Sequence, residues 1–334
     1  MLRTSLTDLL AIDVPVVGAP MAGVSGGRLA AAVTAGGGLG MIGAGSSTPP
    51  EWIAAEAARA REAGARFGVG LMAWALPGLP GQLEATLQAR PALASVSFGD
   101  LVPWVPPLRE AGIIVATQVG RVDEARAAAD QGADVIVARG AEGGGHGLDE
   151  VATLPLLEGV LDAVSQPVLA AGGIGTPRGL AAVLAAGAAG AWIGTALLAC
   201  PEALTDAQAR ARILAAGETG TVYTRVFDVA LRIGWPPEYG GRALANEFSR
   251  RWAGREDELA AAGGAREELS AARKRGDYDI AYQYAGQAVG LVREERRRQK
   301  GLQGSEPHVS GQHVQMIAQT DGTAARHEIG RAHV

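Results

Sequence analysis

The stretch G-I-I-V-A-T-Q-V-G-R-V-D-E-A-R-A-A-A-D-Q-G-A-D-V-I-V-A-R-G, residues 112–140, decides the fold. It opens with the run Ile113–Gln118, whose apolar residues are continuous at the start, as in a parallel strand covered on both faces. An alanine-rich helical stretch follows at Val122–Gln131 and ends on Gly132, a common helix stop. A second apolar run, Asp134–Arg139, completes a strand–helix–strand unit.

The same unit recurs along residues 14–215. The other strand-like runs are Val14–Ala19, Leu39–Gly43, Phe67–Leu71, Ala94–Phe98, Pro167–Ala171 and Ala191–Thr195. The other helical stretches are Arg28–Ala35, Glu51–Ala63, Gln82–Ala89, Pro106–Ala111, Leu154–Ala163, Pro177–Ala186 and Pro201–Ala215. This repetition predicts an α/β fold, a (β/α)8 TIM barrel. A doubly wound open sheet is the alternative, but the even spacing and the glycine-rich loops favour closure.

The character of the chain changes twice after the repeats. We expect residues 1–217 to form the barrel and residues 218–300 a smaller, mainly helical appendage over its mouth. The expected helical segments of the appendage are Arg242–Trp252, Asp257–Arg275 and Tyr278–Val292. Periodicity vanishes after that, so we expect residues 301–334 to be disordered. Their closing E-I-G-R-A-H-V resembles a translated sequencing adapter, which makes this tail an expected artefact.

Charge and cysteine content exclude several classes of protein. Thirty Lys and Arg oppose 35 Asp and Glu, so no basic surplus favours nucleic acid or an anionic membrane. Cys200 is the only cysteine, which excludes disulfides within the chain and fits a reducing compartment. No uncharged apolar stretch reaches the ~18 residues of a membrane span, and the N-terminus lacks a leader pattern. We therefore expect a soluble, cytoplasmic protein, whose oligomeric state stays open.

Glycine loops after the strands point to a ligand, because ligands of such barrels bind at the carboxyl ends of the strands. The last two loops read A-A-G-G-I-G-T (170–176) and I-G-T (193–195). Gly172, Gly173 and Gly194 permit close approach to the backbone and Thr195 adds a hydroxyl, which together predict a phosphate site. The loop after the first strand, A-P-M-A-G (19–23), would suit a flat ring, or it is an ordinary proline turn.

His146 is the only histidine before the tail, and it closes the run A-R-G-A-E-G-G-G-H (138–146) at a strand end. A neutral imidazole there could accept a proton from a carbon acid, or stabilise an anion once protonated. A hydrogen-bonded loop histidine is the alternative. Glu142 could orient the ring, although we expect this carboxylate to face a helix or solvent.

Two other kinds of site are not predicted. One histidine without a neighbouring carboxylate pair cannot supply the three or four ligands of a metal site. The run G-G-G-L-G (36–40) precedes a strand instead of following one, so we interpret it as a helix stop and not as a dinucleotide fingerprint.

Taken together, several segments resemble the nitronate monooxygenase family, which comprises FMN-dependent (β/α)8 enzymes. The likeness runs from Pro15 to Val292 and is specific for the wider family. The segments are P-V-V-G-A-P-M-A-G-V (15–24), L-A-A-A-V-T-A-G-G-G-L-G (29–40), V-S-F-G (96–99), G-A-D-V-I-V-A-R-G-A-E-G-G-G-H-G (132–147), V-L-A-A-G-G-I-G-T-P-R-G (168–179) and I-G-T (193–195).

The resemblance implies an FMN cofactor and the oxidation of alkyl nitronates by O₂ to a carbonyl compound and nitrite, with nitroalkanes as further candidate substrates. It implies that His146 is the catalytic base beside the flavin, and that the glycines and Thr195 hold the phosphate. It also implies that the ring lies near residues 19–22 and that Gln118 reaches its polar edge. The full set implied at the cofactor is Ala19, Pro20, Met21, Ala22, Gln118, Arg139, Gly145, Ala171, Gly172, Gly173, Gly194 and Thr195.

Departures from the family pattern add three expectations. The family usually has Gln at Arg139 and Ala at Gly143, so we hypothesise that Arg139 lies near the pyrimidine edge and stabilises an anionic reduced flavin. An Asn often found after the third strand is absent from G-V-G-L (68–71), which removes one polar flavin contact. The loop Trp74–Gly81 is expected to line the substrate pocket, or Trp74 is plain packing.

Other functions remain open at this point. The nearest is an FMN-dependent NAD(P)H oxidoreductase of the enoyl-acyl carrier protein reductase or quinone reductase type, which shares the glycine–histidine and A-A-G-G-I segments. A flavin-free barrel that binds a sugar phosphate is a second alternative. A barrel that only binds or scaffolds is the third.

Overall fold

Eight parallel strands close into the barrel that the sequence predicts. The computed structural model describes residues 2–292, so the expected tail at 301–334 and the end of the expected appendage lie outside the described residues. The strands run in the order β1-β9-β8-β6-β5-β4-β3-β2. A bridge between Val17 and Leu39 joins the two ends of this order and closes the barrel. The bounds are β1 Val16–Gly18, β2 Gly40–Gly43, β3 Phe67–Met72, β4 Leu93–Ser97, β5 Ile114–Val119, β6 Val135–Arg139, β8 Val168–Ala171 and β9 Gly190–Ile193.

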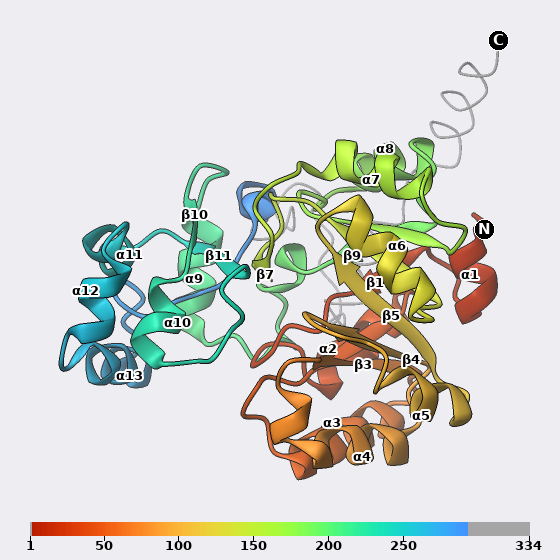
Figure 1. Cartoon of the computed structure of the whole chain (residues 1–334), viewed down its shortest axis with the longest axis horizontal. Coiled ribbons are helices and arrows are strands. Elements are labelled where there is room, and N and C mark those ends of the chain that lie inside the picture. The colour runs from red at the N-terminus through yellow and green to blue at the C-terminus, as the bar shows by residue number, and fades with distance from the viewer. Residues whose placement is uncertain (1, 293–334) are drawn as a thin grey trace, which may run out of the picture.

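Helices follow the strands and form the outer layer of the barrel (Figure 1). They are α2 Gly27–Ala35, α3 Pro50–Glu62, α4 Pro80–Ala89, α5 Val105–Glu110, α6 Val122–Asp130, α7 Thr153–Leu161, α8 Pro177–Ala185 and α9 Ala207–Ala215. Only α9 differs clearly from its predicted bounds. A 3-10 turn, η2 (Thr195–Leu197), comes first, and the Asp206 side chain then caps α9 by accepting from the N–H of Ala209.

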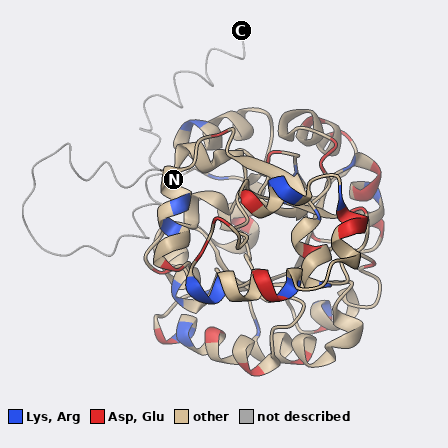
Figure 2. Ribbon diagram, turned by 90° about the vertical axis from the view of Figure 1, so that its left-hand side faces the viewer, with Lys and Arg blue, Asp and Glu red and all other residues tan. Residues whose placement is uncertain are grey.

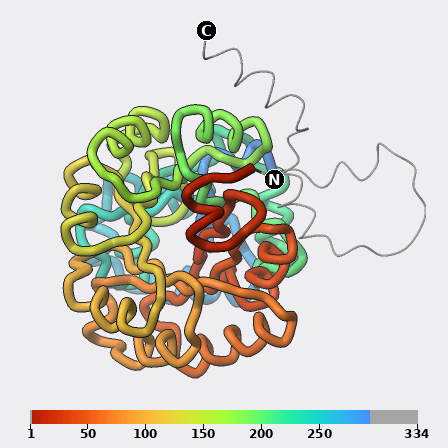
Figure 3. The backbone as a smooth tube through the Cα atoms, turned by 90° about the vertical axis from the view of Figure 1, so that its right-hand side faces the viewer, coloured from red at the N-terminus to blue at the C-terminus, as the bar shows by residue number. Residues whose placement is uncertain are grey.

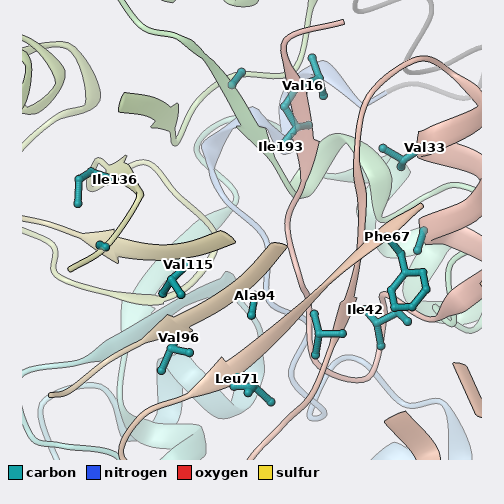
Figure 4. Packing of buried hydrophobic residues seen from close by; sticks show 14 of the residues in the cluster. Val16, Val33, Ile42, Phe67, Leu71, Ala94, Val96, Val115, Ile136 and Ile193 are labelled. Atoms are coloured by element: carbon teal, nitrogen blue, oxygen red, sulfur yellow. The ribbon is translucent and has the colours of Figure 1, made fainter. Parts of the chain in front are cut away.

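Small residues let the helices pack close to the strands. A Cβ built on Gly40 of β2 would lie 2.0 Å from the carbonyl oxygen of Ala30 in α2, so only glycine fits there. Ile42, Val96, Val115 and other buried side chains fill the layer between strands and helices (Figure 4). Because the layers lie so close together, small side chains fill the space between them and few aromatic residues are needed.

A short helix that the sequence did not predict, α1 (Ser5–Leu10), closes one end of the barrel (Figure 3). Its Leu6 and Leu10 are fully buried in the cluster that fills the barrel interior, together with Val17 and Leu169. Thr4 caps the helix through reciprocal hydrogen bonds with Thr7. The amino ends of the strands are therefore sealed, and the opposite end is the one left for a ligand.

The appendage lies on the side of the barrel away from α1 (Figure 1). It contains a three-stranded antiparallel sheet in the order β10-β11-β7, in which β10 (Thr221–Thr224) and β11 (Gly240–Leu244) come from the appendage and β7 (Gly145–Gly147) from the barrel. Four helices surround this sheet: α10 Val226–Leu231, α11 Glu247–Trp252, α12 Glu256–Ala261 and α13 Ala265–Arg275. Phe227 and Phe248 are fully buried between them and stack at 5.8 Å.

Four segments differ from what the sequence predicted. The expected helix Asp257–Arg275 is two helices, α12 and α13, which are separated at residues 262–264. Residues 242–244 of the expected helix Arg242–Trp252 belong to strand β11. The expected helix Tyr278–Val292 is instead a turn at 278–281, a strap without helix at 282–286 and a 3-10 turn, η3 (Gln287–Leu291). Tyr282 and Tyr284 alternate with other residues at the period of extended chain, and Tyr284 bridges Ala243. His146 lies on strand β7 and not in a free loop.

Lys and Arg are interspersed with Asp and Glu over the outer helices (Figure 2). Among residues 2–292, no helix combines the length and the apolar character needed to cross a membrane.

Candidate functional site

A cavity of about 450 Å³ opens at the carboxyl ends of the barrel strands, between them and the appendage. Its volume lies within the range of small-molecule sites. The barrel supplies the loops after β1, β2, β8 and β9, and the appendage and the strap supply Asp228, Trp235, Arg273, Tyr282 and Tyr284. All thirteen residues that the sequence placed at a catalytic or cofactor position line this cavity: Ala19, Pro20, Met21, Ala22, Gln118, Arg139, Gly145, His146, Ala171, Gly172, Gly173, Gly194 and Thr195.

The loop after β8 has a backbone form that requires glycine. Gly172 and Gly173 have φ angles of 109° and 70°, which side chains rarely adopt. A Cβ on Gly172 would also lie 2.7 Å from Thr153 Oγ1. The Thr195 hydroxyl accepts from the backbone N–H of Gly286 at 2.9 Å, so it holds the strap against this wall and keeps its own proton for a ligand.

The loop after β1 lies across the end of the barrel. A Cβ on Gly70 would be 2.3 Å from the Pro20 ring, and one on Gly43 would be 2.6 Å from the Pro20 carbonyl carbon. Ser25 fixes the loop because its hydroxyl donates to the carbonyl of Ala19 at 3.0 Å. The close contact with Pro20 gives a physical reason for glycine at position 70 of β3.

His146 is held by three side chains of the appendage and strap. Its Nε2 is 2.9 Å from Asp228 Oδ2, and its side chain is only 9% exposed. The Trp235 ring stacks on the imidazole with centroids 3.7 Å apart and planes 8° apart. Tyr284 donates from its hydroxyl to the other Asp228 oxygen at 3.3 Å, with its ring 4.9 Å from the imidazole. Burial of this hydroxyl, followed by the nearby Asp228 charge, raises the Tyr284 pKa well above its usual value, so Tyr284 remains a donor.

This arrangement selects one tautomer of the neutral imidazole. The carboxylate of Asp228 accepts a hydrogen bond from Nε2–H, which leaves the lone pair on Nδ1. Glu142, the orienting residue considered from sequence, does something else. Its carboxylate accepts from the N–H and hydroxyl of Thr153 at the start of α7. The helix-facing alternative was therefore correct, and the partner of His146 is Asp228.

Arg139 lies beneath β7 with its side chain buried. Its guanidinium donates to the carbonyls of Gly143, Gly145 and Leu148 and so fixes the strand that carries His146. Burial lowers the Arg139 pKa to about 10, because the charged form is desolvated. Its Nε has no acceptor among the described residues, although the residue lines the cavity. Contact between Arg139 and a flavin stays a prediction.

Gln118 also acts on the backbone of the histidine strand. Its Nε2 donates to the carbonyl of His146 at 3.2 Å, and its own N–H donates to Ser97 Oγ at 3.0 Å. One amide proton of Gln118 remains for a ligand.

The loop Trp74–Gly81 supports the site from behind. The Trp74 ring lies 5.1 Å from the Trp235 ring, and Phe98 packs on the same Trp235 at 5.0 Å. Cavity-lining residues of the described chain come from other segments, so the packing alternative for Trp74 was correct.

Sequence reasoning missed Asp228, Trp235 and Tyr284. The available signal for Asp228 was an acidic residue inside the apolar run V-F-D-V-A-L (226–231), since a buried carboxylate needs a partner. Among residues 2–292, no group of three or more His, Cys, Asp or Glu side chains is arranged to hold a metal ion.

Comparison with known proteins agrees with this fold. A structure of FabK from Thermotoga maritima superposes with a TM-score of 0.84 at 28% identity, covering 99% of this chain and 100% of that one. Nitroalkane oxidase from Streptomyces ansochromogenes superposes with a TM-score of 0.77 at 30% identity, covering 98% and 99%.

The curated relatives include dehydrogenases and nitronate monooxygenases. Two (3aS,4S,5R,7aS)-5-hydroxy-7a-methyl-1-oxo-octahydro-1H-indene-4-carboxyl-CoA dehydrogenases, from Rhodococcus jostii and Mycobacterium tuberculosis, are 37% and 38% identical over 68% of this chain. The alignment spans 64% of the length of each of these dehydrogenases. A nitronate monooxygenase from Paraburkholderia phytofirmans is 31% identical over 87% of this chain and 91% of its own length.

The sequence profile of one family covers both the barrel and the appendage. It matches residues 3–75 and 71–295, and thus includes the β7 strand with His146 and the elements that supply Asp228 and Tyr284. The chain belongs to the nitronate monooxygenase family.

Proposed function

We propose that this protein catalyses the flavin-dependent oxidation of alkyl nitronates and nitroalkanes by O₂, to a carbonyl compound and nitrite. The observation that carries the proposal is the His146–Asp228 pair, buried at the wall of a cavity at the strand ends. The family match and the nitronate monooxygenase relatives support the same conclusion.

The cavity walls fit an FMN molecule. The left-handed glycines at 172 and 173, with Gly194 and Thr195, would hold the phosphate, because glycine backbone and a hydroxyl permit close approach of an anion. A Cβ on Gly145 would meet no atom within 4 Å, so this position borders open space in the cavity. One proton of the Gln118 amide is a donor for polar groups of the cofactor. When bound, FMN supplies the redox chemistry and the reaction with O₂.

His146 supplies the proton chemistry. Its Nδ1 lone pair accepts the α-proton of a neutral nitroalkane, and Asp228 stabilises the imidazolium that results. A preformed nitronate has already lost this proton and does not need the step. Trp235 covers one face of the imidazole and keeps water from it.

Anaerobic mixing tests the proposal directly. We expect propyl nitronate to change the visible flavin spectrum of the purified protein and NADPH to leave it unchanged. Reduction by NADPH alone would assign the chain to the NAD(P)H oxidoreductases, and a protein without flavin would refute the cofactor as well as the function.

A second candidate is dehydrogenation of a CoA-linked substrate at the same site. Two observations favour it: the 37% and 38% identity to the two dehydrogenases, and the free cation at the cavity mouth described below.

A further inference from the structure

Arg273 on α13 is placed at the mouth of the cavity. Its guanidinium carbon lies 4.9 Å from the centroid of the Tyr282 ring, which fixes the side chain by a cation–π contact. Its Nη2 reaches toward the loop after β1, where a Cβ on Gly23 would be 3.9 Å away. Arg273 therefore extends from the appendage to the barrel loops and lines the cavity between them.

The charge of Arg273 is not neutralised within the described chain. Among residues 2–292, no carboxylate lies within 4 Å of it, whereas Arg251 and Arg255 in the same appendage pair with Glu268 and Glu258. The cavity wall contains one carboxylate among these residues, Asp228, which His146 and Tyr284 already engage. An anion that enters the mouth thus meets a positive charge without competition from acidic side chains.

Hydroxyl groups lie on the barrel side of the same mouth. Buried Gln82 donates to the carbonyls of Gly45 and Thr48 and fixes the turn between them. This turn presents Ser46 and Ser47 to the cavity. A Cβ on Gly45 would lie 3.3 Å from Ala22 Cβ, so the turn borders the loop toward which Arg273 reaches.

Between the mouth and the imidazole runs a row of aromatic rings. Tyr282 lies 5.2 Å from Tyr284, which lies 4.9 Å from His146. Such a row suits an apolar chain that separates a reacting carbon at one end from an anion at the other.

We propose that Arg273, with the hydroxyls of Ser46 and Ser47, forms an anion subsite that selects substrates with an anionic group remote from the reacting carbon. The group is a carboxylate on a short substrate or the phosphates of a CoA-type tail. This inference rests on the cavity assigned under the proposed function, but it does not require that the substrate be a nitronate.

The test compares Arg273→Gln with Lys274→Gln in the flavin-loaded protein. Lys274 is the adjacent residue of α13, exposed and outside the cavity wall, so its variant removes the same charge from the same helix. Kinetics would use the nitronates of 4-nitrobutanoate and 1-nitropentane, which differ in the terminal charge. We expect a lower KM for the anionic nitronate in the parent protein. Arg273→Gln should reduce this preference about five- to tenfold, and Lys274→Gln should change it less than twofold.

A binding measurement separates this inference from the proposed reaction. Hexanoate and hexanol, and CoA and pantetheine, would be titrated while the flavin spectrum is followed, with no turnover required. If hexanoate binds more tightly than hexanol, the subsite binds a carboxylate, and if CoA binds more tightly than pantetheine, it binds phosphates. In either case Arg273→Gln must abolish the difference in affinity between the two members of the pair. If the anion is not preferred in either pair, or both variants lose the preference equally, the subsite is refuted, whether or not nitronates react.

Discussion

Replacement of Asp228 by Asn tests the proton chemistry of the site. The carboxylate is 2% exposed and 2.9 Å from His146 Nε2. Asn keeps the volume but removes the charge that stabilises the imidazolium. Its amide can also donate to Nε2, which would move the imidazole proton to Nδ1 and block the base.

The size of the effect follows from the geometry. Two unit charges about 4 Å apart interact with roughly 4 kcal/mol at an effective dielectric constant of about 20, which sets the upper bound. A hydrogen bond retained by Asn and adjustment of the surroundings reduce this to about 2–3 kcal/mol. We therefore expect kcat/KM for nitroethane to fall roughly 30- to 150-fold.

Comparison of two substrates provides the control. Ethyl nitronate has already lost the α-proton, so Asp228→Asn should slow its oxidation much less than that of nitroethane. The deuterium isotope effect on 1,1-dideuterated nitroethane should rise toward its intrinsic value, because proton removal becomes rate-limiting. Tyr284→Phe, which removes only the 3.3 Å hydrogen bond to Asp228, should cost less than tenfold. An equal loss on nitroethane and on ethyl nitronate would refute the role of the pair in proton transfer.

Two further predictions concern the flavin and the fold. Arg139→Gln should lower the two-electron potential of the flavin by roughly 30 mV for each 1.4 kcal/mol of lost stabilisation of the reduced form. Burial lowers the Arg139 pKa to about 10, so the parent protein loses this charge as the pH rises through that value. The difference in flavin potential between the parent and the variant should therefore shrink near pH 10. If the variant has the same flavin potential as the parent at pH 8, contact between Arg139 and the flavin is contradicted. Leu6→Ala should reduce the free energy of unfolding by about 3 kcal/mol in denaturant titration, because Leu6 is fully buried in the barrel interior. It should leave the flavin content unchanged, since α1 lies at the end of the barrel opposite the cavity; loss of flavin would show that the two ends are coupled.

The barrel was predictable because its signals are local. Apolar runs such as Ile113–Gln118 and helix stops such as Gly132 each depend on a few adjacent residues. Helix α1 was not predicted because its six residues are too few to display a helical period, and its apolar side chains have a role only once they pack into the barrel interior. The strap was misjudged because Tyr278–Val292 has one charged residue, Asp279, and therefore no charge pattern that could identify a helix. The alternation of Tyr282 and Tyr284 was the better signal.

The candidate site was predictable only in its barrel half. His146 and the glycines follow strands and are identified by that position. Asp228 lies 82 residues after His146, and its contact with the imidazole depends on how β7 pairs with β11. No periodicity in one sequence specifies such a pairing across distant segments. The role of Arg139 in holding β7 depends likewise on a fold-back of the chain after β6.

The pairing of β7 with β11 also has a consequence for biosynthesis. Because a ribosome makes the chain from its N-terminus, the barrel strands through β9 emerge while Trp235 and Tyr284 are still untranslated. In a nascent chain the glycine loops at the strand ends can thus be in place before Trp235 and Tyr284 contact the site of His146. The surroundings of this imidazole are therefore complete only after residue 284 has been synthesised and the strap has reached β11.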